Sequence, residues 1–292
     1  MPSPALFMNL LLDFVSRQQQ VRVPEPEMVM DDDANTEAFM KAGREDGILA
    51  HTYLYHAIQA SAVIAPGARV LDLGCGPANQ LALIAQLNPD AHFIGVDASD
   101  SMLALARETL IRCKVSNVEL RKASIDDLRE WGDGSVDAVV STITLHHLPD
   151  IATLDAVMRE TARVLKPGGG LYIADFGRMK RQAGQAALAN DRKAIQPEIF
   201  TQDFYNSVRA AFSLEEMTKA SSVLGPTVSI KRTFLVPFLL VIRSAHDQPI
   251  PAACREAAKR IYATFSARQR RDFFDLTMAF KHGGFPLAFK PQ

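Results

Sequence analysis

The chain has 292 residues, a formal net charge of −1 and a hydrophobic fraction of 48%, a composition typical of a soluble globular protein. Its near-neutral charge predicts neither a nucleic acid nor an anionic membrane as partner. Cys75, Cys113 and Cys254 are scattered, which indicates a reducing compartment and no metal site. The apolar run Ala5–Val15 is too short to span a bilayer and lacks a basic leader. We therefore expect a cytoplasmic protein with one large α/β domain.

The first sixty residues are expected to form helices around a loop. Leu6, Leu10 and Phe14 recur at helical spacing, and this apolar stripe suits packing on the core or in a homodimer. A membrane role is the weaker interpretation. Residues Arg22–Asp33 contain two prolines and five acidic residues, so we expect a loop there. A second helical region is expected at about Thr36–Ile64.

From Val70 onward, strand and helix patterns alternate, which predicts a parallel sheet with crossover helices. The expected strands are Val70–Leu73, Phe93–Val96, Val118–Leu120, Asp137–Thr142 and Leu171–Ala174. Beyond Phe176 the alternation ends. The sequence then predicts partly helical structure, a capping box at Ser213–Glu216, two strands at about Val228–Phe234 and Phe238–Ile242, and a helical tail.

The stretch Val70–Asn79, Val-Leu-Asp-Leu-Gly-Cys-Gly-Pro-Ala-Asn, is typical of a buried strand that turns tightly into a helix. Gly74 and Gly76 allow a ligand to approach the backbone where a Cβ would intrude. Asp72 would repel a pyrophosphate, but it suits a ligand with an amino group and a positive centre. An ordinary strand–turn–helix corner is the alternative.

Asp97 ends the next expected strand, 25 positions after Asp72. In a doubly wound sheet this position lies beside the first turn, where a carboxylate can accept both hydroxyls of a ribose. Such an acid serves NAD and S-adenosylmethionine equally, so Asp72 and Asp97 together indicate an adenosine site. A helix-capping aspartate is the alternative interpretation.

The Asp-x-Gly-x-Gly turn resembles the first motif of class I S-adenosylmethionine-dependent methyltransferases. Four further motifs extend the resemblance in order over Val70–Phe176. They are Gly95–Ser99 with Met102, Ser124–Leu128, Ser135–Asp137 with Leu145–Asp150, and Leu165–Gly169. The branch that the chain resembles contains the ubiquinone and menaquinone methyltransferases. The resemblance implies a Rossmann-like, seven-stranded, mostly parallel sheet with an antiparallel last strand and helices on both faces.

The resemblance also implies a set of cofactor-binding residues. They are Asp72, Gly74, Gly76, Asp97, Ala98, Met102, Ser124, Ile125, Asp126 and Thr142. The cofactor would be S-adenosyl-L-methionine, with S-adenosyl-L-homocysteine as the product. Two positions depart from the family pattern. Ala78 replaces a third glycine, which a small residue should tolerate, and Ser124 replaces an aspartate that contacts the adenine amino group, so Asp126 is the expected substitute.

Candidates for the chemistry follow the fourth strand. His146 and His147 would lie beside the methyl group, and His147 is the first candidate for a general base. Helix capping and lining of the cofactor are equal alternatives for both histidines. Tyr53, Tyr55 and Tyr205 are candidates for contacts with the acceptor, although helix packing explains Tyr53 and Tyr55 better.

We expect a helical extension at residues 1–60 that forms part of a lid. A cofactor-binding domain at 61–245, with an insertion at about 177–212, and a helical C-terminal extension at 246–292 complete the predicted organisation. The expected function is methyl transfer to an oxygen, nitrogen or carbon atom of a small organic acceptor. A peptide or protein methyltransferase and a non-catalytic cofactor-binding sensor or partner subunit are the alternatives. The cysteines that arsenic methylation would need are absent.

Overall fold

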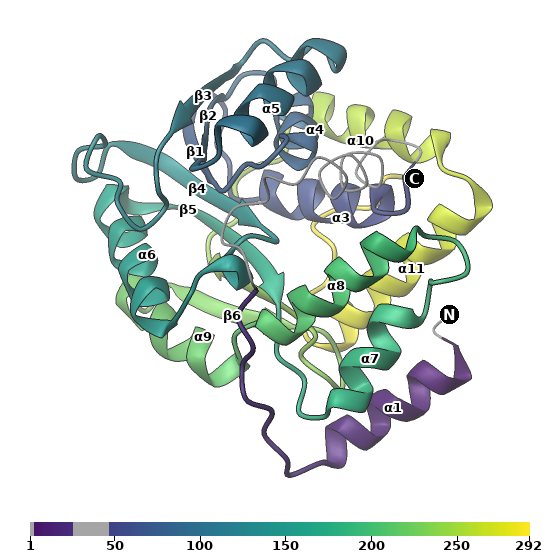
Figure 1. Ribbon diagram of the computed structural model, residues 1–292. Coiled ribbons are helices and arrows are strands. Elements are labelled where there is room, and N and C mark those ends of the chain that lie inside the picture. Colours follow the sequence, from purple (N-terminus) through teal and green to yellow (C-terminus); the bar gives the residue numbers. More distant parts are fainter. Residues whose placement is uncertain (1–2, 26–46) are drawn as a thin grey trace.

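The structure, a computed structural model, describes residues 3–25 and 47–292. A seven-stranded sheet forms its centre, in the order β3-β2-β1-β4-β5-β7-β6 (Figure 1). Its strands are β1 Arg69–Leu73, β2 His92–Asp97, β3 Val118–Lys122, β4 Val136–Thr142, β5 Leu165–Phe176, β6 Val228–Arg232 and β7 Leu239–Ser244. The first five strands pair in parallel, whereas β7 runs antiparallel to both β5 and β6. The predicted sheet with an antiparallel last strand is therefore confirmed.

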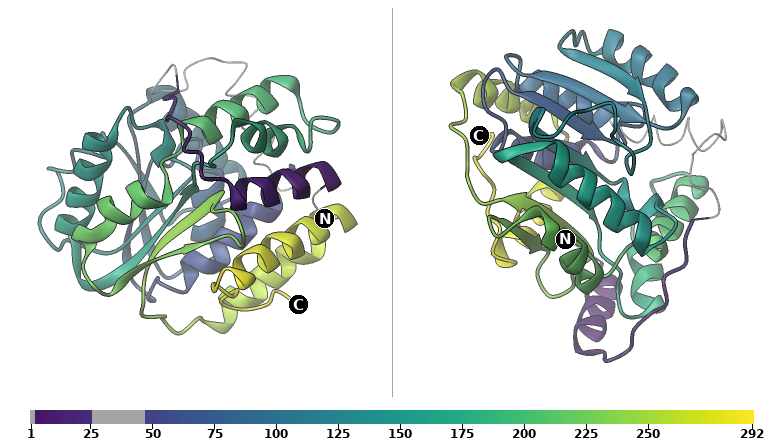
Figure 2. Two further views of the ribbon diagram at one scale, coloured as in Figure 1. Left: turned by 90° about the horizontal axis from the view of Figure 1, so that it is seen from below. Right: turned by 90° about the vertical axis from the view of Figure 1, so that its left-hand side faces the viewer.

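Helices cover both faces of the sheet, as Figures 1 and 2 show. One face carries α3 Ala50–Ser61, α4 Asn79–Leu87 and α5 Asp100–Arg112, with α10 Ala252–Thr264 and α11 Ala267–His282 packed over them. The other face carries α6 Ile151–Val164, α9 Leu214–Ser221 and the 3₁₀ turn η2 Ser222–Leu224. Within the described residues, no helix is both long and apolar enough to cross a membrane.

The inner strands of the sheet are apolar on both faces, and each face packs into its own core. In β5, Tyr172 and Ala174 belong to the core under α3, while Leu171 and Ile173 belong to the core under α6. Two buried faces explain the near-continuous hydrophobic runs of the sequence, which are typical of parallel strands.

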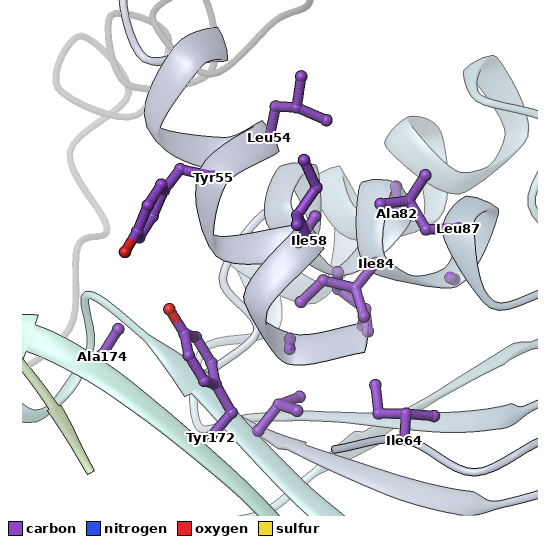
Figure 3. Packing of buried hydrophobic residues seen from close by; sticks show 14 of the residues in the cluster. Leu54, Tyr55, Ile58, Ile64, Ala82, Ile84, Leu87, Tyr172 and Ala174 are labelled. Atoms are coloured by element: carbon purple, nitrogen blue, oxygen red, sulfur yellow. The ribbon is translucent and has the colours of Figure 1, made fainter. Parts of the chain in front are cut away.

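Tyr55 belongs to the core under α3. Its ring is fully buried and stacks on Phe280 of α11, with ring centroids 5.0 Å apart. Figure 3 shows it beside Tyr172 of the sheet and on the same helix as Leu54 and Ile58. The expected acceptor contact for Tyr55 is therefore wrong, and helix packing is its role.

Two element boundaries differ from the prediction. Strand β5 begins at Leu165, six residues before its expected start at Leu171. Leu165 pairs with Val136 and, after a register shift, Gly170 pairs with Ala138. Residues 165–170, which were expected to precede the strand, are therefore part of it. The second N-terminal helix, α3, begins at Ala50. The expected helical structure at residues 36–46 and the expected loop at residues 26–33 lie outside the described residues.

The N-terminal helix α1, Pro4–Val15, packs beside α7, Gln182–Asn190, which in turn packs against α8, Glu198–Ala210. Asp13 anchors α1, because its buried carboxylate accepts the backbone N–H groups of Lys180 and Arg181. Leu6 is buried, whereas Phe7 and Phe14 are half exposed. Only part of the predicted apolar stripe therefore packs on the rest of the molecule.

Residues 16–25, which we call the N-terminal strap, run from α1 to the turn that follows β4. Arg22 ties the strap down. Its guanidinium lies 4.0 Å from the ring centroid of Phe212 and donates to the carbonyls of Ala210, Pro149, His146 and Leu148. A single side chain thus joins the strap to the end of α8 and to the turn after β4.

Candidate active site

A cavity of about 1290 Å³ opens at the carboxyl edge of β1, β2 and β4. Residues of α1, α7, α8 and α11 form its outer walls. Its volume exceeds the ~300–1,000 Å³ of an ordinary small-molecule site. The carboxyl edge at which strand order reverses is where doubly wound sheets bind their ligands, and here it lies between β1 and β4.

The glycine turn after β1 forms the floor of this cavity. The N–H groups of Gly74 and Cys75 both donate to the carbonyl of Val96, which fixes the turn against β2. Gly74 has φ +70°, and a Cβ there would lie 2.1 Å from the Thr144 side chain. Gly76 has φ +50°, and apart from its two chain neighbours no atom of the described residues lies within 4 Å of where its Cβ would be. Gly76 therefore leaves open space in which a ligand can approach the backbone.

Ala78, the departure from the third glycine, adopts a left-handed conformation with φ 60° at the start of α4. It is fully buried in the core. A small residue is thus accommodated, in a conformation that glycine would adopt without the steric cost of a Cβ.

Asp72 and Asp97 face the cavity from the ends of neighbouring strands. Asp72 is buried, and no hydrogen bond from the described residues reaches its carboxylate. Burial, together with the charge of Asp97, raises the pKa of Asp72 to about 7. A buried carboxylate without a partner fits a ligand that carries a cationic amino group, because the ligand would supply the missing donor and charge.

Asp97 is held by the backbone on both sides. Its carboxylate accepts the N–H of Gly76 at 2.8 Å and the N–H of Ser99 at 2.9 Å. Ser99 caps α5, since its hydroxyl accepts the N–H of Met102. The interpretation of Asp97 as the helix cap is thus wrong, and its carboxylate is fixed beside the glycine turn.

The remaining candidates for cofactor binding lie on the same cavity, with one exception. Ala98, Met102, Ser124, Ile125 and Thr142 line it. Asp126 does not, and its carboxylate instead accepts the hydroxyl of Ser124. Asp126 is thus linked to the cavity through Ser124, and its expected role in place of the missing aspartate stays a prediction.

The turn after β4 contains the 3₁₀ helix η1, Leu145–His147, and is tied to the glycine turn. The Thr144 hydroxyl donates to the carbonyl of Gly74 at 3.0 Å. Asp175, at the end of β5, accepts the N–H groups of Thr144 and His146 at 3.1 Å each. These bonds hold the two histidines at a defined position beside the glycine turn.

His146 is engaged in a buried ion pair. Its Nδ1 lies 2.7 Å from a carboxylate oxygen of Asp175, and both side chains are about 2% exposed. Burial opposes charge on both groups, but their attraction and hydrogen bond prevail. They raise the pKa of His146 and lower that of Asp175. His146 is thus buried and paired, whereas the more exposed His147 stays the first candidate for chemistry.

His147 lines the cavity with a partly exposed ring and pairs with Glu25 of the strap. The His147 Nδ1 lies 2.6 Å from one oxygen of Glu25, and the Ser207 hydroxyl donates to the other oxygen at 2.8 Å. Burial opposes ionisation of Glu25, yet the His147 hydrogen bond and the two histidine charges lower its pKa to about 2. Burial and the charge of Glu25 raise the pKa of neighbouring Asp203.

Sequence reasoning missed Glu25, Ser207 and Asp203. Glu25 was one of five acidic residues in an expected loop, and nothing local distinguishes it from the others. Ligand atoms of Glu25, His146 and His147 lie within 4.8 Å of one another, a spacing close enough for a metal ion. Because the carboxylates and imidazoles already bond to one another, we assign no metal to them.

The other two tyrosine candidates lie in different places. Tyr53 is buried and lines the cavity. Tyr205 lies outside the cavity lining, where its hydroxyl accepts from Gln182 and the Arg209 guanidinium lies 5.3 Å from its ring centroid. The ring of Tyr205 contacts α7 through Gln182, and its expected contact with the acceptor stays a prediction.

Aromatic rings surround the histidine turn. Phe176 lies 5.1 Å from His146 and 5.3 Å from Phe204, measured between ring centroids. Among the described residues that line the cavity, aspartates outnumber arginines. The aspartates are Asp72, Asp97, Asp191, Asp203, Asp272 and Asp275, and the arginines are Arg192 and Arg268. Arg192 is itself paired with Asp272 at 2.6 Å. The cavity therefore has aromatic rings near the histidines, and its lining holds more aspartates than arginines.

Comparison with known proteins identifies both the fold and the family of the chain. A S-adenosylmethionine-dependent methyltransferase from Aquifex aeolicus has a similar structure, with a TM-score of 0.53 and 18% identity over 74% of this chain and 98% of that chain. A family model described as a methyltransferase domain matches residues 64–220, more than half of the chain. The protein therefore belongs to this methyltransferase family.

Curated relatives share part of this chain. An arsenite methyltransferase from Halobacterium salinarum is 40% identical over 118 residues, which cover 40% of this chain and 29% of the relative. A demethylmenaquinone methyltransferase from Listeria monocytogenes is 31% identical over 154 residues, 52% of this chain and 63% of the relative. The chain thus spans less than two thirds of the length of either relative.

Proposed function

We propose that the protein transfers the methyl group of S-adenosylmethionine to a small organic acceptor. The observation that carries this proposal is the unpartnered, buried carboxylate of Asp72 beside the open glycine turn. Asp72 would hold the amino group of the cofactor, Asp97 would accept its ribose hydroxyls, and Met102 and Ile125 would enclose the adenine. When bound, the cofactor supplies a methyl group that its sulfonium already activates. The residues around it then align the acceptor and exclude water.

The cavity supports an acceptor that is neutral or cationic and largely apolar. Its volume leaves room beside a cofactor, and Phe176 and Phe204 offer flat apolar surfaces near the histidines. Aspartates outnumber arginines in its lining, which disfavours an acceptor with several carboxylates. Among the described lining residues the one cysteine is Cys75, in the glycine turn, which gives no support to thiol-dependent arsenic chemistry.

Within this function, His147 is the proposed general base. Its ring lines the cavity, and an imidazole takes up a proton near neutral pH. Replacing His147 with Ala or Asn should lower turnover by roughly 10²–10⁴-fold while leaving cofactor affinity nearly intact. A loss below about tenfold in both variants, with unchanged stability, would exclude His147 as the base.

We also propose that α1, α7 and α8 form a cover over the acceptor side of the site. They form part of the outer walls of the cavity, and reactive chemistry that must exclude water often uses a mobile cover. The predicted division into a cofactor-binding domain at 61–245 and two helical extensions stays part of this proposal.

The test combines binding with turnover. Titration with S-adenosylhomocysteine measures the cofactor site, and a screen of neutral, cationic and anionic metabolites and of peptides measures acceptor-dependent release of S-adenosylhomocysteine. We expect tight binding and release with a neutral or cationic small molecule. Binding without release from any pool would favour a sensor or partner subunit, and release with peptides alone would favour a peptide methyltransferase.

A further inference from the structure

Glu25 reaches the active site from the N-terminal strap, far in sequence from the strands that build the cavity. Its carboxylate is only 7% exposed. One of its oxygens lies 2.6 Å from the Nδ1 of His147, and the other accepts the hydroxyl of Ser207 on α8. Both oxygens of the carboxylate are thus engaged, so the side chain is held in one orientation toward the histidine ring.

The contact with Glu25 determines which nitrogen of His147 carries the proton. A neutral imidazole has one N–H donor and one acceptor nitrogen, and a carboxylate can only accept. The Nδ1 of His147 must therefore carry the hydrogen. In the neutral ring, Nε2 is then the nitrogen with the free lone pair, and the ring is 29% exposed and lines the cavity. This is the tautomer that a base at Nε2 requires.

The groups around the ring leave Glu25 as its direct partner. Asp175 of β5 is bonded to His146, and Asp203 of α8 acts on the two histidines only through its charge. Arg22 of the strap is bonded to four backbone carbonyls. Of the charged groups that face His147 in the described residues, Glu25 alone makes a hydrogen bond to it.

We propose that Glu25 is a positioning residue that fixes the tautomer and orientation of His147 so that Nε2 faces the acceptor. This inference rests on the proposed function, since it makes the base of that reaction depend on the strap. It assigns a role to a segment that precedes every element of the sheet. It also explains why Arg22 ties the strap so firmly to the histidine turn.

Two substitutions at Glu25 separate charge from hydrogen bonding. In Glu25→Gln, the amide oxygen still accepts from Nδ1 but the negative charge is lost. Turnover should fall by less than about tenfold, because the hydrogen bond that orients the ring is kept. In Glu25→Ala the ring loses its partner, so turnover should fall by about 10²-fold, within the range for a lost base. The matched control is Glu198→Gln, which removes an exposed carboxylate of α8 and should leave turnover unchanged.

Two further measurements distinguish positioning from a structural role. Nitrogen-15 NMR of the histidines should show His147 protonated on Nδ1 in the wild type and in Glu25→Gln, and as a mixture of tautomers in Glu25→Ala. In a double-mutant cycle, Glu25→Ala should cost little further turnover once His147 is Ala.

An Nε2–H tautomer in the wild type, or full additivity in the cycle, would overturn the inference. Stoichiometric binding of Zn²⁺ or Mn²⁺ to the wild type that Glu25→Gln abolishes would also overturn it. If His147→Ala keeps full turnover, the general-base part of the proposed function fails, and the tautomer measurement still decides whether Glu25 fixes the ring.

Discussion

Cofactor binding should depend on pH through Asp72. In the free protein, burial and the charge of Asp97 raise the pKa of Asp72 to about 7. A ligand with a cationic amino group needs this carboxylate ionised, so binding below about pH 7 must release a proton. Each pH unit below that value should then weaken binding about tenfold, or ~1.36 kcal/mol. Between about pH 7.5 and about pH 5.5 the expected loss is about 25-fold, or ~1.9 kcal/mol.

The raised pKa of Asp72 also predicts how the stability of the free protein depends on pH, and the direction is opposite to that for cofactor binding. Because the folded-state pKa of Asp72 is raised, the stability associated with its neutral form is present at low pH. That stability is lost as pH rises from about 4 to about 7. The stability gained on adding cofactor should consequently be largest above about pH 7.

Isothermal titration calorimetry with S-adenosylhomocysteine tests this reasoning. Titrations in two buffers of different ionisation enthalpy should show release of nearly one proton at about pH 6. Asp72→Asn should bind weakly and with no pH dependence over the same range. Affinity that stays constant in the wild type, or an equal pH dependence in Asp72→Asn, would refute the assignment of Asp72 to the amino group.

Further predictions concern the glycine turn, the strap and the proposed cover. Gly74→Val should abolish cofactor binding and lower thermal stability, because its Cβ would collide with Thr144; normal affinity in a calorimetric titration would contradict this. Asp97→Ala should weaken binding by roughly 1.5–3 kcal/mol and keep the fold, as circular dichroism can verify. Arg22→Met should lower the free energy of unfolding by about 1.5–3 kcal/mol in urea denaturation, and no change would mean that its carbonyl contacts carry no stability. Limited proteolysis should cut within Arg178–Asp203 in the free protein and more slowly with cofactor and acceptor, whereas equal rates would indicate a rigid segment.

The sheet and the cofactor side of the site could be predicted because their signals are local. Strands buried on both faces appear as hydrophobic runs, and the residues at their ends follow directly in sequence. Asp72 and Asp97 come together by topology alone, since β1 and β2 are parallel neighbours. The reason expected for Gly74 was nevertheless incomplete, because the nearest obstacle to a side chain there is Thr144 rather than a ligand.

The acceptor side could not be predicted in the same way. Glu25 and Ser207 meet across the chain, and neither belongs to a periodic pattern that would indicate the contact. Tyr55 was a candidate for contact with the acceptor, but the packing of α3 against α11 buries its ring in the core. Asp126 bonds to Ser124 and does not itself line the cavity, and the spacing of the two residues in the sequence could not show which of them faces it.

The cavity is built partly by the ends of the sheet strands and partly by helices outside the sheet, and this has an evolutionary consequence. The residues proposed to hold the cofactor lie on β1, β2, β4 and the turns that follow them. The outer walls come from α1, α7, α8 and α11, none of which forms part of the sheet. Mutation or recombination in those outer segments can change the accepted substrate while the strand ends stay intact. A library that varies only the outer walls is therefore a practical route to new methyl acceptors on this scaffold.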